Sequence, residues 1–309
     1  MEPAEKKIAV AGLSVWSNSF LVALKLVVGL MMGSVSVLSE AIHSGIDLVA
    51  ALVARYSVKR SAEPADMDHT YGHGKYENLS GFFEGALIFL AAAIIVYEAG
   101  KRLFDVTEVE MLHAGMLVMA ISAGVNIVVS RKLFRVAKET ESLALEADAY
   151  HLMTDVWTSA GVFVALGVIL VTGWQIVDPV VAMIVAVLIF RAAFDITKRS
   201  CDGLLDRSLP EHEMRVLEAV VRRHEVHFVD YHRLRTRKVG AERQVDLHVT
   251  VPRGMTVIDS HSLIERLEGE IREALPGSTI VVHVEPCEKD CESCKLSERE
   301  QVFRSKNPP

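Results

Sequence analysis

The first two thirds of the chain alternate between long apolar stretches and short polar connections. Six stretches have about the 20 residues that a helix needs to cross the hydrocarbon core of a membrane. They lie near residues 8–31, 35–57, 79–100, 111–132, 147–172 and 176–196. The second stretch is less apolar than the others because it contains Glu40, His43 and Asp47. The pattern predicts an α-helical membrane domain of six transmembrane helices over residues 1–206.

From residue 207 the apolar runs end and shorter periodic patterns begin. Two segments have the apolar spacing of amphipathic helices and three alternate as strands do. In chain order they are the helix 210–223, the strands 226–236 and 242–251, the helix 257–275 and the strand 278–285. This order predicts a small α+β domain, ferredoxin-like (αββαβ), with two layers and an antiparallel sheet over residues 207–286. A cysteine-containing tail, residues 287–309, follows it.

Composition agrees with a membrane part joined to a soluble part. Half of the 309 residues are apolar and the mean hydropathy is +0.28, yet 24% of the residues are charged. An ordinary soluble protein is less apolar than this. The net charge of −7 and the lack of a basic stripe argue against a nucleic-acid partner.

Basic residues concentrate in every second connection between the apolar stretches. Lys6 and Lys7 precede the first stretch, whereas only Lys101 and Arg102 lie in the connections of the opposite side. The other basic residues of the first side are Lys59, Arg60, Lys75, Arg131, Lys132, Arg135, Lys138, Arg191, Lys198 and Arg199. Because basic residues stay on the cytoplasmic side of short loops, both termini are expected in the cytoplasm.

Two ionisable pairs, His43-x3-Asp47 and His151-x3-Asp155, lie inside predicted spans. Residues four apart share one face of a helix. Such groups are costly at membrane depth and by default mark an ion path. Together the pairs offer two imidazoles and two carboxylates, which suit a tetrahedral cation such as zinc. The alternative, that each pair is only a hydrogen-bonded structural group, is less favoured because two matched pairs occur.

Two further groups of possible metal ligands lie outside the spans. Asp66, His69 and His73 lie in the loop after the second span, where a His-x3-His spacing could bind a metal or the histidines could simply be solvated in a turn. Cys287, Cys291 and Cys294 follow the last strand. Thiolates bind soft metals, but three of them lack a fourth ligand, so metal capture and a flexible tail both remain open.

Several polar or small residues in the spans have structural explanations. Asn18 and Asn126 could form hydrogen bonds between helices, and Gly81-x3-Gly85 permits close helix packing. Lys25 lies deep in the first span, where it either extends its amine to the membrane surface or pairs with an acid.

The intramembrane pairs, the loop from Asp66 to Glu77 and the ending His283-Val284-Glu285-Pro286 resemble the cation diffusion facilitator family. The resemblance covers nearly the whole chain. It implies a homodimeric metal/proton antiporter with six transmembrane helices and a cytoplasmic domain. Such a protein would carry divalent metal cations out of the cytoplasm, in contact with membrane lipid, and a bacterial inner membrane is expected.

The resemblance also implies three groups of metal ligands. The transport site would be His43, Asp47, His151 and Asp155, and the loop site Asp66, His69 and His73. A pair of zinc ions at or near the dimer interface would be bound by His232, His248, His261, His283 and Glu285. Glu285 stands where an aspartate is common in the family, which leaves the bridging geometry open.

Zinc is the expected cargo and also a structural or regulatory ion. Imidazole favours zinc and its neighbours, and the family pattern ties a histidine at position 43 to zinc, whereas iron-associated relatives have aspartate there. Cadmium, cobalt, iron and manganese remain alternatives. Protons would compete with metal for the same ligands. A zinc hydrolase within the membrane is a weaker alternative, because the sequence has no HExxH helix and no serine–histidine arrangement.

Overall fold

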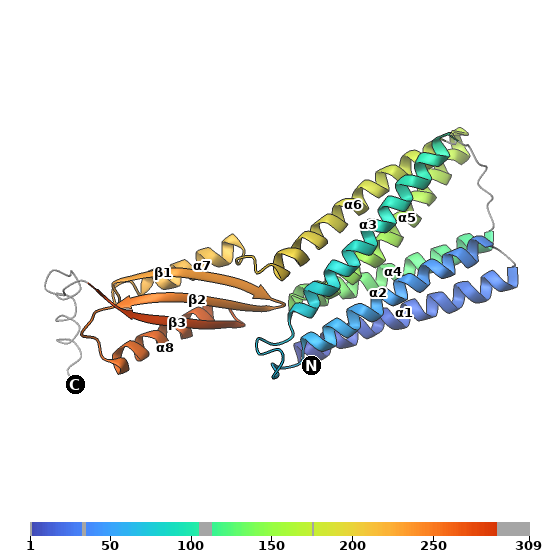
Figure 1. Cartoon of the computed structure of the whole chain (residues 1–309). Helices are drawn as coiled ribbons and strands as arrows, with labels where there is room; N and C mark the ends of the chain where they lie inside the picture. Colours follow the sequence, from blue (N-terminus) through green and yellow to red (C-terminus); the bar gives the residue numbers. More distant parts are fainter. Residues whose placement is uncertain (1, 33–34, 105–112, 175, 289–309) are drawn as a thin grey trace. The chain divides into compact units, whose positions relative to one another are not determined.

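The computed structural model of the chain describes residues 2–32, 35–104, 113–174 and 176–288 (Figure 1). The chain divides into two compact units, one ending at Leu204 and the other beginning at Leu205. Cys291 and Cys294 lie outside the described residues, so metal capture by the cysteines of the tail stays one of the two alternatives that the sequence left open.

The first unit consists of six long helices. They are α1 (Pro3–Met32), α2 (Val35–Ser61), α3 (Lys75–Phe104), α4 (His113–Thr140), α5 (Leu143–Thr172) and α6 (Val177–Leu204). Among the described residues, five of them (α1, α2, α3, α5 and α6) are long and apolar enough to cross a membrane. The helices extend beyond the predicted apolar stretches because their polar ends continue the helix past the hydrocarbon core. The helical membrane domain expected from the sequence is confirmed.

Figure 1 shows these helices in two groups, α1, α2 and α4 in one and α3, α5 and α6 in the other, which diverge away from the N-terminal end. Glycines allow α3 and α6 to approach closely. A Cβ atom on Gly81 would lie 2.6 Å from Ser200 Oγ, and one on Gly85 would overlap the side chain of Thr197. The Gly81-x3-Gly85 motif therefore packs α3 against α6, as small residues do between membrane helices.

A buried carboxylate joins four helix ends in the first unit. Lys7 Nζ of α1 lies 2.7 Å from Glu77 Oε1 of α3, and the hydroxyl of Ser61, the last residue of α2, donates to the same oxygen at 3.0 Å. Ser142, which caps the start of α5, donates to Glu77 Oε2 at 2.5 Å. Glu77 thus holds together, at one end, the two helices that carry the predicted metal ligands, α2 and α5.

The second unit has the predicted order of elements. These are α7 (Glu211–Arg223), β1 (Asp230–Val239), β2 (Glu242–Val251), α8 (Val257–Ala274) and β3 (Ser278–Pro286). The prediction of a wholly antiparallel sheet is wrong. In the order β1-β2-β3, the pair β1–β2 is antiparallel, but β3 runs parallel to β2. The crossover through α8 returns the chain to the end of the sheet at which β2 began, which makes this pair parallel.

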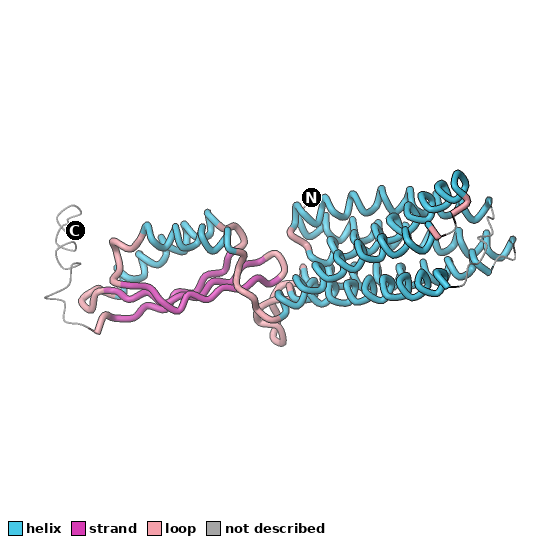
Figure 2. Tube along the Cα trace, turned by 90° about the horizontal axis from the view of Figure 1, so that it is seen from above, coloured by secondary structure: helices cyan, strands magenta, loops and turns pink. Residues whose placement is uncertain are grey.

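The two helices of this unit cover a single face of the sheet (Figure 2). Along β2 the inward side chains Val245, Leu247, Val249 and Val251 are buried, and they pack with Leu217 and Val221 of α7 and Leu263 and Leu267 of α8. Because side chains alternate between the faces of a strand, the residues between them lie on the other face, which these helices leave uncovered.

One buried ion pair connects α7 to the sheet. Arg243 Nε and Nη2 donate to the two carboxylate oxygens of Glu213 at 2.9 and 2.6 Å, and both side chains are at least nine-tenths buried. Arg243 also donates to the backbone oxygens of Ala241 and Pro276. A bidentate pair of this kind is expensive to break because its surviving charge stays buried.

The Glu213→Ala substitution is expected to lower the free energy of unfolding of a fragment beginning at Leu205 by about 3–5 kcal/mol, because it leaves Arg243 buried without its carboxylate. Urea unfolding followed by circular dichroism measures the loss. Glu211→Ala is the matched control, since Glu211 pairs with Arg215 on the same helix in an exposed position and should change stability little. Equal losses in both variants would contradict the expectation.

Candidate metal sites

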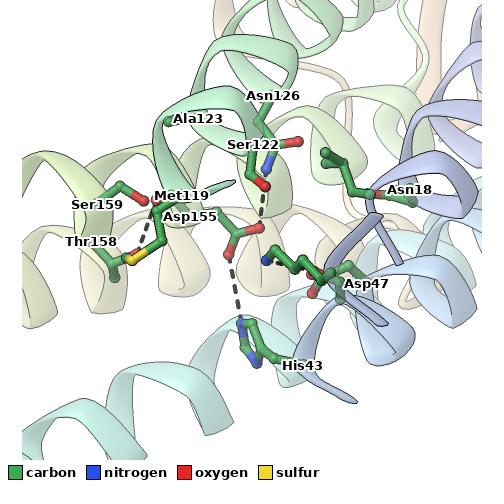
Figure 3. Close-up of a pocket in the computed structure, with 13 residues that line it drawn as sticks. Asn18, His43, Asp47, Met119, Ser122, Ala123, Asn126, Asp155, Thr158 and Ser159 are labelled. Carbon is green, nitrogen blue, oxygen red and sulfur yellow. Dashed lines mark hydrogen bonds and ion pairs between the residues drawn. The ribbon is translucent and has the colours of Figure 1, made fainter. Parts of the chain in front are cut away.

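Members of both intramembrane pairs meet inside the first unit, His43 and Asp47 from α2 and Asp155 from α5 (Figure 3). His43 Nε2 of α2 lies 3.6 Å from Asp155 Oδ1 of α5. Ligand atoms of His43, Asp47 and Asp155 all lie within 4.8 Å of one another. This spacing is suitable for three donors around one metal ion. The two helices together provide these three donors, which neither helix provides alone.

His151 lies beside this group and does not complete it in this conformation. Its Nε2 atom is 3.0 Å from Asp47 Oδ1, and both side chains are buried. The structure therefore brings three of the four predicted transport ligands into one cluster and places the fourth in contact with one of them.

The cluster opens into a polar cavity of about 80 Å3 between α1, α2, α4 and α5. Asn126 of α4 donates from Nδ2 to Asp155 Oδ2 at 3.1 Å, so the interhelical hydrogen bond expected for this asparagine is made with a candidate ligand (Figure 3). The lining residues are Asn18, Leu21, Lys25, His43, Ser44, Asp47, Met119, Ser122, Ala123, Asn126, Asp155, Thr158 and Ser159. A cavity of this size has room for an ion and accompanying water.

The loop between α2 and α3 brings Asp66, His69 and His73 together, with ligand atoms within 4.8 Å of one another. Backbone N–H groups of His69 and Asp68 donate to Asp66 Oδ1 at 2.6 and 3.0 Å. The bond from His69 is the main cause that lowers the pKa of Asp66 below its ordinary value. The carboxylate is thus kept ionised, as a metal ligand must be.

His73 is oriented by the backbone. Its Nδ1 donates to the carbonyl oxygen of Pro64 at 3.2 Å, which leaves the lone pair of Nε2 facing Asp66 Oδ2 at 3.3 Å. A histidine held in this way through its other nitrogen is typical of metal sites. Gly72 has a φ of +78°, so the segment is a loop and not a helical His-x3-His clip.

In the second unit three histidines form a row across the uncovered face of the sheet. His232 of β1 pairs with His248 of β2, and His248 pairs with His283 of β3. Glu285 lies nearest to two of them, with Oε1 2.8 Å from His248 Nδ1 and Oε2 3.2 Å from His232 Nε2. Ligand atoms of His232, His248 and Glu285 lie within 4.8 Å of one another.

The other two predicted ligands of this unit lie differently. His283 Nε2 is 3.6 Å from Glu285 Oε1, at the edge of the group. His261 lies on α8, is 71% exposed and pairs with Glu265 at 3.4 Å, and it joins none of the three groups found among the described residues. Cys287 is buried, and its backbone N–H donates to Val251.

Two buried acids in the membrane helices were not singled out by the sequence analysis. Glu84 of α3 and Asp148 of α5 are 0% and 1% exposed, and they are close enough for their charges to interact. Asp148 lies one helical turn before His151. Their position inside the predicted spans was the available signal, because acids at such depth are rare without a role.

Glu285→Gln is expected to lower the melting temperature of the metal-free fragment from Leu205 onward at neutral pH. The hydrogen bond from His248 lowers the pKa of Glu285. A lowered pKa contributes stability above the ordinary carboxyl value, and the contribution is lost as the pH falls through the lowered pKa. The difference between wild type and variant should therefore close below about pH 4. A difference that is equally large in acid would contradict this.

Comparison with known proteins agrees with this geometry. Residues 12–205 match the model of the cation efflux transmembrane domain, and residues 209–287 match that of the cytoplasmic domain of cation efflux proteins, a dimerisation domain. Among curated proteins, the uncharacterized transporter sll1263 of Synechocystis sp. is 37% identical over 90% of both chains. The cation-efflux pump FieF of Shewanella oneidensis is 28% identical over 86% of this chain and 89% of that protein.

A solved structure of CzrB is 30% identical and covers 26% of this chain and 99% of that chain, with a TM-score of 0.25. The matched family models cover both units and describe transporters, not enzymes. The family resemblance seen in the sequence is confirmed. The chain belongs to the cation diffusion facilitator family and is a membrane-embedded, dimer-forming cation efflux transporter.

Proposed function

We propose that the protein exports zinc from the cytoplasm in exchange for protons, across a bacterial inner membrane and with both termini in the cytoplasm. The observation that carries the proposal is the cluster of His43, Asp47 and Asp155, whose ligand atoms lie within 4.8 Å of one another in a polar cavity between membrane helices. The two helices that supply these ligands, α2 and α5, belong to the two groups that diverge in Figure 1. Their relative movement would expose the cluster alternately to the two sides.

The donor atoms favour zinc. Zinc in proteins is commonly held by four ligands in a tetrahedron, with nitrogen and oxygen among the donors. The transport site would offer such a set, with two imidazole nitrogens from His43 and His151 and two carboxylates from Asp47 and Asp155. Manganese and other hard ions prefer oxygen ligands alone. Iron, cobalt and cadmium can use mixed nitrogen and oxygen sites, so they are the nearest rivals as cargo.

Protons compete with zinc for the same atoms. A histidine binds metal only when neutral and a carboxylate only when ionised, so a proton on any ligand weakens the hold on the metal. Histidine changes its charge near physiological pH, which makes the competition effective under cellular conditions. Proton entry would then release zinc on the outer side and return the site without metal.

The two groups outside the membrane helices support the transport site. The loop group, Asp66, His69 and His73, would offer zinc a second site at the membrane surface. In the cytoplasmic domain, His232, His248, His283 and Glu285 would hold structural or regulatory zinc at or near the dimer interface. His261 lies apart from these four residues in the described chain, so in this arrangement it would not bind the same zinc ion as they do.

Everted membrane vesicles acidified inside should accumulate zinc, and an ionophore that collapses the proton gradient should end accumulation against the zinc gradient. Asp155→Asn should reduce this uptake to background, because it removes a charged ligand while preserving the shape of the side chain. A zinc-sensitive dye inside the vesicles measures uptake. Concentrative uptake that ignores the ionophore would refute proton coupling, and normal uptake by a folded, dimeric Asp155→Asn variant would refute the transport site.

His43→Asp should broaden selectivity toward harder ions such as manganese, because an oxygen ligand replaces an imidazole. The side chain is half exposed, so a shorter residue is tolerated at this position without loss of packing. Competition between zinc and manganese for flux into proteoliposomes measures the change. An unchanged ranking of the two metals would place the selectivity in other residues.

A further inference from the structure

A lysine lies in the same cavity as the predicted metal ligands. Lys25 of α1 is 6% exposed, and its Nζ atom donates to Ser44 Oγ of α2 at 2.8 Å. The side chain is thus directed into the protein and does not extend to the membrane surface. Of the two sequence-based alternatives for Lys25, the structure excludes an extended lysine at the surface.

The position of Ser44 brings the ammonium group close to the ligands. Ser44 follows His43 directly and precedes Asp47 by three residues on α2, so it lies within one turn of both. Lys25, Ser44, Asp47 and Asp155 all line the cavity of about 80 Å3. In a space of this size the charge of Lys25 acts on any ion that the ligands hold, because the effective dielectric constant around groups enclosed by protein is well below that of bulk water.

This charge has opposite effects on the empty and the loaded cavity. When no metal is bound, a positive charge offsets the two carboxylates of Asp47 and Asp155, which would otherwise be costly at membrane depth. When a divalent cation is bound, the same charge repels it, and twice as strongly as it would repel a proton. Both effects lower the affinity of the site for metal.

A low affinity has a use in a transporter. An ion must bind well enough to enter and weakly enough to leave, and a site with two carboxylates and two imidazoles holds zinc tightly if nothing opposes it. We propose that Lys25 is a built-in counter-cation of the transport site, which sets its affinity for divalent metal low enough for release. This inference rests on the proposed transport function of His43, Asp47, His151 and Asp155.

The alternative is that Lys25 only joins α1 to α2 through Ser44. The two roles predict different changes in zinc affinity when Lys25 is replaced. Loss of a purely structural contact loosens the site, so the zinc concentration for half-maximal flux (KM) rises or stays the same. Loss of a counter-cation tightens the site, so KM falls while release slows and kcat falls with it.

The test is zinc flux into proteoliposomes containing the full-length protein, because flux must pass through the membrane site, whereas total zinc binding would also count the other zinc ligands of the chain. Lys25→Met removes the charge and keeps an unbranched side chain of similar length. It should lower KM about tenfold, which lies within the usual range of the effect that one interacting group has on the affinity of another. Its kcat should fall as well. Lys25→Arg, which keeps the charge, is the matched control and should resemble wild type in KM.

Lys25→Gln serves as a second uncharged variant, which can still donate to Ser44, in case Lys25→Met does not assemble. An unchanged or raised KM in either uncharged variant, with the dimer intact by gel filtration, overturns the proposal. A wrong transport site would give a different result from a wrong role of Lys25, because wild type and Asp155→Asn would then transport zinc equally.

Discussion

The structure depends on one constraint, the cost of placing ionisable side chains at membrane depth. His151 with Asp47 and His43 with Asp155 meet that cost by facing each other across α2 and α5. Each contact joins one residue from each helix, so the polar groups that would be expensive on an isolated helix stabilise a helix pair instead. Three of these groups, His43, Asp47 and Asp155, line a cavity, and imidazole and carboxylate are ligands that zinc accepts.

The rest of the membrane unit keeps this helix pair in position. Glu77 connects α3 to the ends of α1 and α2 and to the start of α5, and Gly81 and Gly85 let α3 pack tightly on α6. Strong contacts therefore lie at one end of the helices, whereas the groups diverge away from it (Figure 1). A bundle held at one end can separate at the other, which fits the alternate exposure proposed for the central site.

The cytoplasmic domain brings its candidate metal ligands together by a different route. Its helices cover one face of the sheet, and the opposite face carries mainly polar residues. Strand register then places His232, His248 and His283 side by side, and Glu285 spans two of them with its two oxygens. An uncovered face that carries ligands is available to a partner, in agreement with a domain whose family function is dimerisation.

The sequence by itself determined the six helices, the αββαβ order and the pairing of histidine with aspartate at helical spacing, because these follow from local periodicity. Contacts between distant segments decided the rest. The parallel β2–β3 pair required the path of α8, and the separation of His261 from the other ligands required its place on that helix. The sequence does not indicate in which direction the side chain of Lys25 points. That direction is seen only in the structure, where its amine donates to Ser44 on the neighbouring helix. Periodicity describes one element at a time, whereas a site is a property of how several elements meet.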